Sequence, residues 1–294
     1  MRRETLPLPI LSALAAVALL SVMDVLMKGA ALAIGAFSAA FLRSVFGLAL
    51  AAPIWLARGG RWPTAEVLRV HLLRWVVGAF MALTFFYALT KLPVAETIAI
   101  SFIAPLVALW LAAIFLGESI RREAIVAAVL GLAGTLIIVG GRIGSAQFDR
   151  DTAWGIAAIV VSALLYAGNL VISRHQAQLA RPEEISVFHS GVSAALFAVA
   201  APFLLRLPDT DTTLLLAGSA ALTVAGSMAF AWAYARAEAQ VLVPMEYSAF
   251  LWASLLGWLF FAETVTWTTL LGTAAIVISC WLAARRKHVE QLAI

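Results

Sequence analysis

Long apolar runs restrict the fold of this chain more than any other feature of its sequence. The hydrocarbon core of a bilayer is about 30 Å thick, and an α-helix crosses it with about 20 apolar residues. Ten such runs follow one another, separated by short loops: 9–30, 36–57, 70–90, 93–116, 122–141, 153–173, 185–206, 212–235, 241–262 and 267–284. The sequence lacks the alternating pattern of membrane β-strands. It therefore predicts an all-α integral membrane protein with ten transmembrane helices.

The composition supports this prediction. Of the 294 residues, 63% are hydrophobic and 12% are charged, and the mean hydropathy is +0.99. A soluble domain is about half apolar and about a quarter charged. This chain has too few polar residues to cover a core in water, and no loop is long enough to form a soluble domain.

Loop charge predicts the orientation, because cytoplasmic loops of membrane proteins are rich in lysine and arginine. With a cytoplasmic N-terminus, 14 of the 20 basic residues fall inside and five outside, and Arg43 lies within a helix. The inner set is Arg2, Arg3, Arg58, Arg61, Arg69, Arg74, Arg121, Arg122, Arg174, Arg181, Arg236, Arg285, Arg286 and Lys287, and the outer set is Lys28, Lys91, Arg142, Arg150 and Arg206. We therefore expect a multi-pass membrane protein with both termini in the cytoplasm, and not a nucleic-acid-binding protein.

An internal repeat divides the chain into residues 1–148 and 149–294. At an offset of 145 residues, the stretch "ALLSVMDVLMKGA" (18–30) lies over "ALLYAGNLVISRH" (163–175), and 106–120 lies over 251–265. Each half contains five predicted helices, an odd number, so the halves must cross the membrane in opposite directions. Inverted repeats of this kind are typical of secondary transporters, whose substrate sites lie between the repeats near the middle of the membrane.

The ends of the fourth and ninth runs carry a recognisable motif. Each half ends in "FLGE" (115–118) or "FFAE" (260–263) before its last helix, and 87–118 contains Pro105 ahead of this motif. The chain thereby resembles the drug/metabolite transporter superfamily, with two EamA-type domains, and within it the YddG type of bacterial aromatic amino-acid exporter. The resemblance implies a secondary transporter that exports amino acids, with a preference for aromatic and other large apolar ones.

Polar side chains inside the apolar runs are the candidate substrate site. A charge in mid-helix costs about 2.5–3.5 kcal/mol on insertion scales, so such residues face the interior of a helix bundle or a water-filled cavity. We expect Asp24 and Asn169, which the repeat matches to each other, to bind the amine or carboxylate of the substrate. The complete predicted set is Asp24, Tyr87, Ser101, Phe102, Tyr166, Asn169, Tyr234 and Trp252.

A second group is predicted to act in gating or coupling: Lys28, Glu96, Pro105 and Glu246. Three of these four residues have a structural alternative, and Pro105 is a candidate bending point for a gate. Lys28 lies four residues after Asp24 and could form an ion pair with it, and Glu96 and Glu246 could complement helix dipoles. Asn169 could serve helix packing, and Trp252 could face lipid. The sequence does not name a partner for Arg43.

The sequence contains no signature of an enzyme. It has no H-E-x-x-H, G-x-S-x-G or nucleotide-binding loop, and its single cysteine, Cys280, cannot form an intramolecular disulfide. We expect no cofactor and no metal. The expected partners are a small-molecule substrate and the lipid bilayer, and a monomer is compatible with the sequence. Export of another small metabolite or drug, and a facilitative channel-like pore, remain as alternatives.

Overall fold

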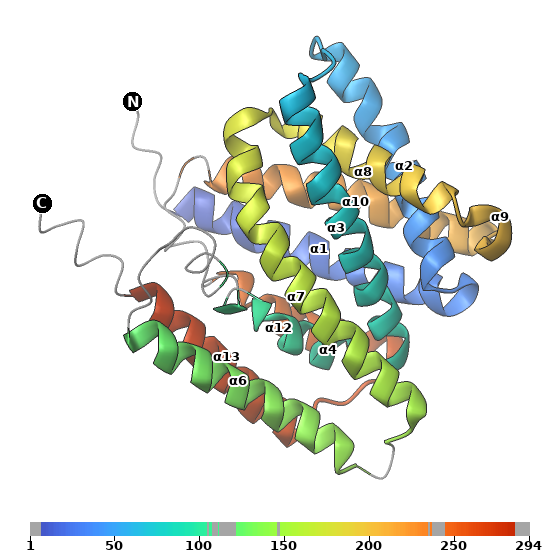
Figure 1. Cartoon of the computed structure of the whole chain (residues 1–294). Helices are drawn as coiled ribbons and strands as arrows, with labels where there is room; N and C mark the ends of the chain where they lie inside the picture. The colour runs from blue at the N-terminus through green and yellow to red at the C-terminus, as the bar shows by residue number, and fades with distance from the viewer. Residues whose placement is uncertain are drawn as a thin grey trace, which may run out of the picture.

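The described part of the chain is entirely helical. A computed structural model describes residues 7–104, 106–107, 111, 122–145, 148–234, 236 and 245–285, and all structural statements below concern these residues. Figure 1 shows their arrangement. The helices are α1 (Pro7–Ile34), α2 (Ala36–Ala57), α3 (Ala65–Lys91), α4 (Val94–Ser101), α6 (Arg122–Ile143), α7 (Arg150–Leu179), α8 (Pro182–Ala198), α9 (Ala201–Leu204), α10 (Thr210–Tyr234), α12 (Ala249–Phe261) and α13 (Trp267–Arg285).

Each of the ten predicted segments contains one of these helices, with changes in extent. The seventh segment is interrupted, so that α8 and the short α9 replace one continuous helix, and within the described residues the fourth continues as a helix only to Ser101. Five of the described helices are long and apolar enough to cross a membrane: α1, α2, α3, α7 and α10. The α6, α12 and α13 helices contain shorter apolar segments.

The third helix begins earlier than predicted. It starts at Ala65, not at residue 70, because Thr64 is its N-cap: the Thr64 side chain accepts a hydrogen bond from the Val67 N–H. Glu66 in the first turn favours the same start, since carboxylates stabilise the positive end of a helix. With this earlier start, Arg74 lies in the third turn of α3 and not in the second turn of the predicted helix.

Every long helix of the first half packs against a helix of the second half. The α1 helix lies along α10, α3 along α7, α2 along α8, and α6 along α13, as Figure 1 shows (the last pair in green and red). The α4 helix likewise contacts α12. Contacts at the two ends of α1 show that it runs antiparallel to α10: the Ser12 hydroxyl donates to the Ala229 carbonyl at 3.0 Å, whereas Gly29 lies against Leu215.

The α3–α7 pair is also antiparallel, and its contacts define the two ends of the bundle. Lys91 near the end of α3 pairs with Asp151 near the start of α7 (Nζ–Oδ2, 2.5 Å). Arg58, which follows α2, pairs with Glu183 near the start of α8 (3.8 Å). We call the first of these ends the Lys28 end, because Lys28 and Leu92 also meet there. We call the second the Arg61 end, because Arg61 lies in the loop that follows α2.

The α6 and α13 helices approach each other closely at glycines. A Cβ atom added to Gly134 would lie 2.6 Å from the Gly272 carbonyl oxygen, and one added to Gly272 would lie 2.5 Å from the Gly134 oxygen. Small residues let helix backbones come into contact in a membrane, where packing replaces the hydrophobic effect as the source of association.

The apolar core is shared by the two halves. Its main cluster joins Met27 of α1, Leu89 of α3 and Val94 of α4 to Leu216 of α10 and Ala253 of α12, all at most 1% exposed. Many large apolar side chains point outward instead, such as Leu132 and Leu136 on α6. This distribution suits a protein surrounded by lipid, whose outer surface need not be polar.

Candidate functional site

Arg74 is anchored inside the bundle by side chains of α7. Its Nε–H donates to the Asn169 side-chain oxygen at 3.0 Å, and an Nη1–H donates to the Gln176 side-chain oxygen. The guanidinium also lies over the Trp75 ring, 4.3 Å from its centroid. These contacts fix the plane of the guanidinium while leaving its remaining N–H groups available for another partner.

A hydrogen-bonded chain supports this arrangement from the Arg61 end. The Gln176 amide nitrogen lies 2.6 Å from His71 Nδ1, and His71 Nε2 lies 3.0 Å from a Glu184 carboxylate oxygen. His71 and Gln176 are fully buried. The buried His71 and Gln176 side chains are therefore both hydrogen-bonded. These bonds hold Gln176 in the orientation in which it accepts from Arg74.

Arg43 and Asp24 form the second charged element of the site. Arg43 is buried within α2, and it interacts electrostatically with Asp24, one helix away on α1. The Arg43 guanidinium also lies over the Phe86 ring at 5.3 Å, and its Nε has no hydrogen-bond partner among the described residues. Asp24 thus provides a nearby opposite charge for Arg43, whose partner could not be predicted.

His189 and Tyr166 connect the two arginines to the rest of the bundle. His189 on α8 stacks on Trp75, with ring centroids 4.0 Å apart, and it lies within electrostatic range of both Arg43 and Arg74. Tyr166 on α7 interacts with Arg74 and with Glu246 just before α12. We use the name central polar cluster for six of the residues described in this subsection: Asp24, Arg43, Arg74, Tyr166, Asn169 and Glu246.

A separate network occupies the Lys28 end. The Lys28 ammonium contacts a Glu263 carboxylate oxygen and donates to the Leu92 carbonyl at 2.7 Å. The other Glu263 oxygen accepts a hydrogen bond from the Val94 N–H at 2.7 Å, so Glu263 also caps α4. Lys28 is therefore paired with Glu263 and not with Asp24, its neighbour on the same helix face.

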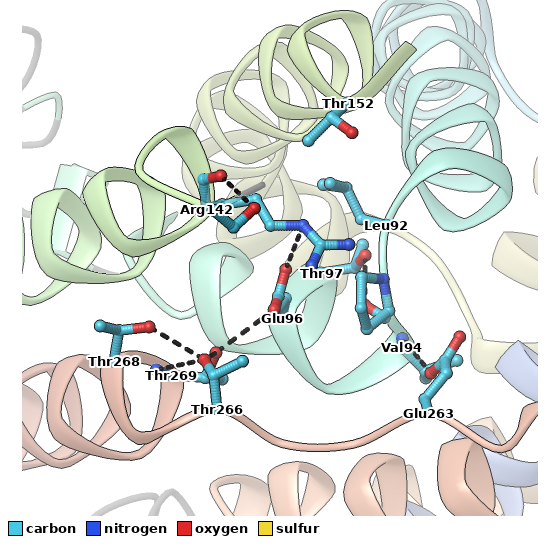
Figure 2. Close-up of polar contacts among 12 residues, drawn as sticks. Leu92, Val94, Glu96, Thr97, Arg142, Thr152, Glu263, Thr266, Thr268 and Thr269 are labelled. Carbon is cyan, nitrogen blue, oxygen red and sulfur yellow. Dashed lines mark hydrogen bonds and ion pairs between the residues drawn. The ribbon is translucent and has the colours of Figure 1, made fainter. Parts of the chain in front are cut away.

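Glu96 extends this network to α6 and α13. Figure 2 shows its carboxylate between Arg142 and Thr269. The Arg142 Nε lies 3.5 Å from Glu96 Oε2, and the Thr269 hydroxyl donates to Glu96 Oε1 at 3.4 Å. Because Glu96 is buried in the first turn of α4, it combines the helix-dipole role with an ion pair.

The other predicted site residues lie in different places. Tyr87 is 36% exposed with the Lys91 ammonium 5.9 Å from its ring centroid, and Trp252 is 37% exposed on α12. The Ser101 hydroxyl donates to the Thr97 carbonyl at 2.9 Å, and Phe102 packs edge-on against Tyr247 at 5.3 Å. Pro105 and the side chain of Tyr234 lie outside the described residues.

Arg74, Gln176 and His71 are the residues that sequence reasoning missed. Arg74 was counted with the inner charges although it lies within the predicted helix 70–90. The signal that could have found it is the cap sequence "TAE" at 64–66, which predicts a helix start at Ala65. Within the described residues, no group of three His, Cys, Asp or Glu side chains could hold a metal ion.

A helical fold with buried charges in an apolar bundle is typical of a membrane transporter, and comparison with known proteins specifies the family. The EamA-like transporter family profile matches residues 7–140 and again residues 153–285. The chain belongs to the EamA-like transporter family, as the sequence motifs predicted. A solved crystal structure aligns with a TM-score of 0.65 over 95% of this chain and 98% of that chain, at 23% identity, which shows a shared fold.

The names of three similar proteins specify different substrates. The chain is 26% identical to the pseudopaline exporter CntI of Pseudomonas aeruginosa, over 91% of this chain and 92% of that protein. It is 25% identical to a riboflavin transporter of Brucella anthropi, over 81% and 84%. It is 29% identical to the aromatic amino acid exporter YddG of Ancylobacter novellus, over 54% and 56%.

Proposed function

We propose that this protein is a secondary transporter that exports amino acids, with a preference for aromatic and other large apolar ones, across the bacterial inner membrane by alternating access. The observation that carries the proposal is the central polar cluster. Two arginines and two carboxylates lie there between elements of both halves, in an otherwise apolar bundle. Such buried charges mark substrate or ion pathways in membrane proteins, and both signs together complement a zwitterion.

In this proposal each end of the zwitterion has a partner. The substrate carboxylate binds the free N–H groups of Arg74, because a guanidinium held in plane by Asn169 and Gln176 presents a planar fork to a carboxylate. The ammonium binds near Asp24, whose carboxylate is otherwise balanced by Arg43. The Phe102 and Tyr247 rings provide an aromatic contact for the side chain.

Alternating access is supported by the pairing of the two halves. Five helix pairs, each joining one segment of the first half to one of the second half, suit two inverted repeats that pack against each other. In this proposal the Lys28-end network closes the outer side of the cluster, and its ion pairs separate when the outer side opens.

A substrate outside the amino acids is the second candidate function. The alignments with the pseudopaline exporter and the riboflavin transporter favour it, because each covers more than four-fifths of this chain. The alignment with the aromatic amino acid exporter covers 54%. Both candidates require a compact polar solute that presents hydrogen-bond acceptors to Arg74. Transport with no dependence on Arg74 would contradict both candidates.

Reconstitution into liposomes tests the proposal. Proteoliposomes loaded with unlabelled amino acid should accumulate external labelled amino acid by counterflow, with saturation, and large apolar amino acids should compete better than charged ones. A channel-like pore would give neither saturation nor counterflow. Repeating the assay with and without a proton gradient decides whether transport is coupled, and unlabelled riboflavin as competitor tests the second candidate.

A further inference from the structure

A polar cavity opens at the Arg61 end, separate from the central polar cluster. It has a volume of about 430 Å³ and lies between the loop after α2 and the start of α8. Its lining residues are Trp55, Arg58, Gly59, Gly60, Arg61, Arg181, Glu183 and Glu184. Cavities of this size accommodate small ligands or the polar part of larger ones.

The cavity is lined by three arginines and two glutamates, so its side chains carry one positive charge in excess. Glu183 is paired with Arg58 at 3.8 Å, and a Glu184 carboxylate oxygen accepts a hydrogen bond from the buried His71 ring at 3.0 Å. Arg61 and Arg181 have no ion pair among the residues that the structure describes. Both carboxylates are therefore already engaged, and the guanidinium groups of Arg61 and Arg181 line the cavity outside any ion pair.

The loop that carries Arg61 is fixed by local structure. At the end of α2 the Gly60 N–H bonds to the Trp55 carbonyl at 2.9 Å and the Gly59 N–H bonds to the Leu56 carbonyl at 3.0 Å, which is the Schellman pattern. Gly59 has φ +72°, and a Cβ atom on Gly60 would overlap the Trp55 ring. The cavity wall is therefore held in shape before any ligand binds.

Tryptophans place this cavity at a membrane surface. Trp62 is 73% exposed and packs edge-on against Phe188, which also contacts Trp55. Exposed tryptophans at helix ends are typical of the interface between lipid tails and headgroups. With the orientation expected from loop charge, this interface belongs to the cytoplasmic leaflet, whose anionic lipids attract basic residues.

We propose that the cavity binds a phosphate group, and that its occupant is the headgroup phosphate of an anionic phospholipid in the cytoplasmic leaflet. Arg61 and Arg181 bind the phosphate oxygens, since a planar guanidinium matches phosphate geometry through paired hydrogen bonds. The Trp62 ring lies against the lipid surface. The bound lipid then joins the α2–α3 loop to the start of α8, across the two halves of the protein. This site is independent of the substrate proposal.

Thermal unfolding in detergent tests the site directly. Phosphatidylglycerol should raise the unfolding temperature of the purified protein more than phosphatidylcholine does, and the double substitution Arg61→Ala with Arg181→Ala should abolish this difference. Arg69→Ala is the matched control, because Arg69 is an exposed arginine near the same end that does not line the cavity. The phosphatidylglycerol concentration giving half of the shift should rise on the order of tenfold in each single variant.

Two outcomes would overturn the proposal. An unchanged phosphatidylglycerol effect in the double variant would show that the lipid binds elsewhere, and an equal loss in Arg69→Ala would show a diffuse charge effect. Inorganic phosphate forms a separate arm. If it stabilises the protein as well as the lipid does and competes with it, the occupant is a free phosphate and the lipid assignment is wrong. Counterflow of amino acids is measured on the same variants, so that failure of transport is distinguished from failure of this site.

Discussion

The Lys28 ammonium on α1 contacts the carboxylate of Glu263, which lies 235 residues further along the chain. Because the same carboxylate accepts the Val94 N–H, one side chain joins α1, the start of α4 and the connection between α12 and α13. Glu263 belongs to the "FFAE" motif of the second half, which gives that motif a structural role in closing the Lys28 end.

Glu263→Gln should lower the stability of the protein by about 3 kcal/mol. The amide can still accept the Val94 N–H, but Lys28 becomes an unpaired charge, and breaking a buried pair costs about 3–5 kcal/mol. Thermal unfolding in detergent measures the loss. Adding Lys28→Met should restore most of it, because no uncompensated charge remains.

The control is the exposed pair of Lys91 and Asp151 near the same end. Their side chains are 24% and 62% exposed, so Asp151→Asn should cost no more than about 1 kcal/mol. If Glu263→Gln is as mild as Asp151→Asn, the Lys28–Glu263 contact does not contribute to the fold.

Arg74→Gln should impair recognition of the substrate carboxylate selectively. Loss of a hydrogen bond to a charged group costs about 1.5–3 kcal/mol, so the apparent KM for an amino acid should rise at least about tenfold. The amide derivative of the same amino acid, which lacks the carboxylate, should be transported equally by both proteins. Counterflow in liposomes gives both constants.

Arg69→Gln provides the comparison for that experiment, since Arg69 is exposed on the same helix. A loss of transport in Arg74→Gln that affects the amino acid and its amide alike would indicate a packing defect, and would remove Arg74 from the proposed binding site.

Gly134→Ala should destabilise the contact between α6 and α13. The added methyl group would press on the Gly272 backbone, which cannot rotate away as a side chain can, and overpacking of this kind costs about 1–3 kcal/mol. Gly140→Ala, on the same helix, has nothing within 4 Å of the new methyl group and should leave the unfolding temperature unchanged or slightly higher. Equal unfolding temperatures for the two variants would contradict the observed helix approach.

The N-cap of α7 should give a pH-dependent contribution to stability. The Asp149 carboxylate accepts hydrogen bonds from the Thr152 N–H and hydroxyl, both at 2.7 Å, and these bonds lower the pKa of Asp149 below its usual value of 3.8. Its contribution is therefore complete above the unfolded pKa and is lost as the pH falls through the lower folded pKa.

Unfolding temperatures between pH 7 and strongly acidic conditions test this cap. Asp149→Ala should be less stable than the wild type at neutral pH, and the difference should shrink as the wild-type carboxylate is protonated. Asp149→Asn should keep much of the cap at every pH, because asparagine also caps helices. A gap between wild type and Asp149→Ala that stays constant with pH would exclude the carboxylate as its source.

Reporter fusions test the orientation on which the outer and inner assignments rest. Loop charge predicts that fusions after residues 35, 61, 146 and 294 lie outside, inside, outside and inside. Alkaline phosphatase activity marks outer positions and green fluorescence marks inner ones. A C-terminus on the outer side would remove the inverted repeat and reverse the direction assigned to both ends of the bundle.

The helices and the family could be predicted from the sequence because both depend on local patterns. Apolar runs specify membrane helices within a few residues, and the repeated motifs before the last helix of each half indicated the EamA-like family correctly. The early start of α3 was also readable from Thr64 and Glu66.

Side-chain partners could not be predicted, because they depend on how each helix is rotated against its neighbours. The spacing of four residues between Asp24 and Lys28 left an ion pair between them as the structural alternative to a substrate site. In the structure Lys28 instead pairs with Glu263, and Asp24 interacts electrostatically with Arg43. Arg43 lies on α2 and Glu263 lies in the connection between α12 and α13, and nothing in the sequence fixes which face of α1 each of these segments meets.

The pairing of every long helix in the first half with one in the second has a consequence for biogenesis. The ribosome delivers α1 to the membrane about 200 residues before its partner α10, and α6 well before α13. Met27 and Leu89 are fully buried in the finished protein. During this interval their side chains contact lipid or the insertion machinery, because the second half has not yet been inserted. If translation stopped between the halves, the first-half helices would remain in the membrane without the second-half helices against which they pack.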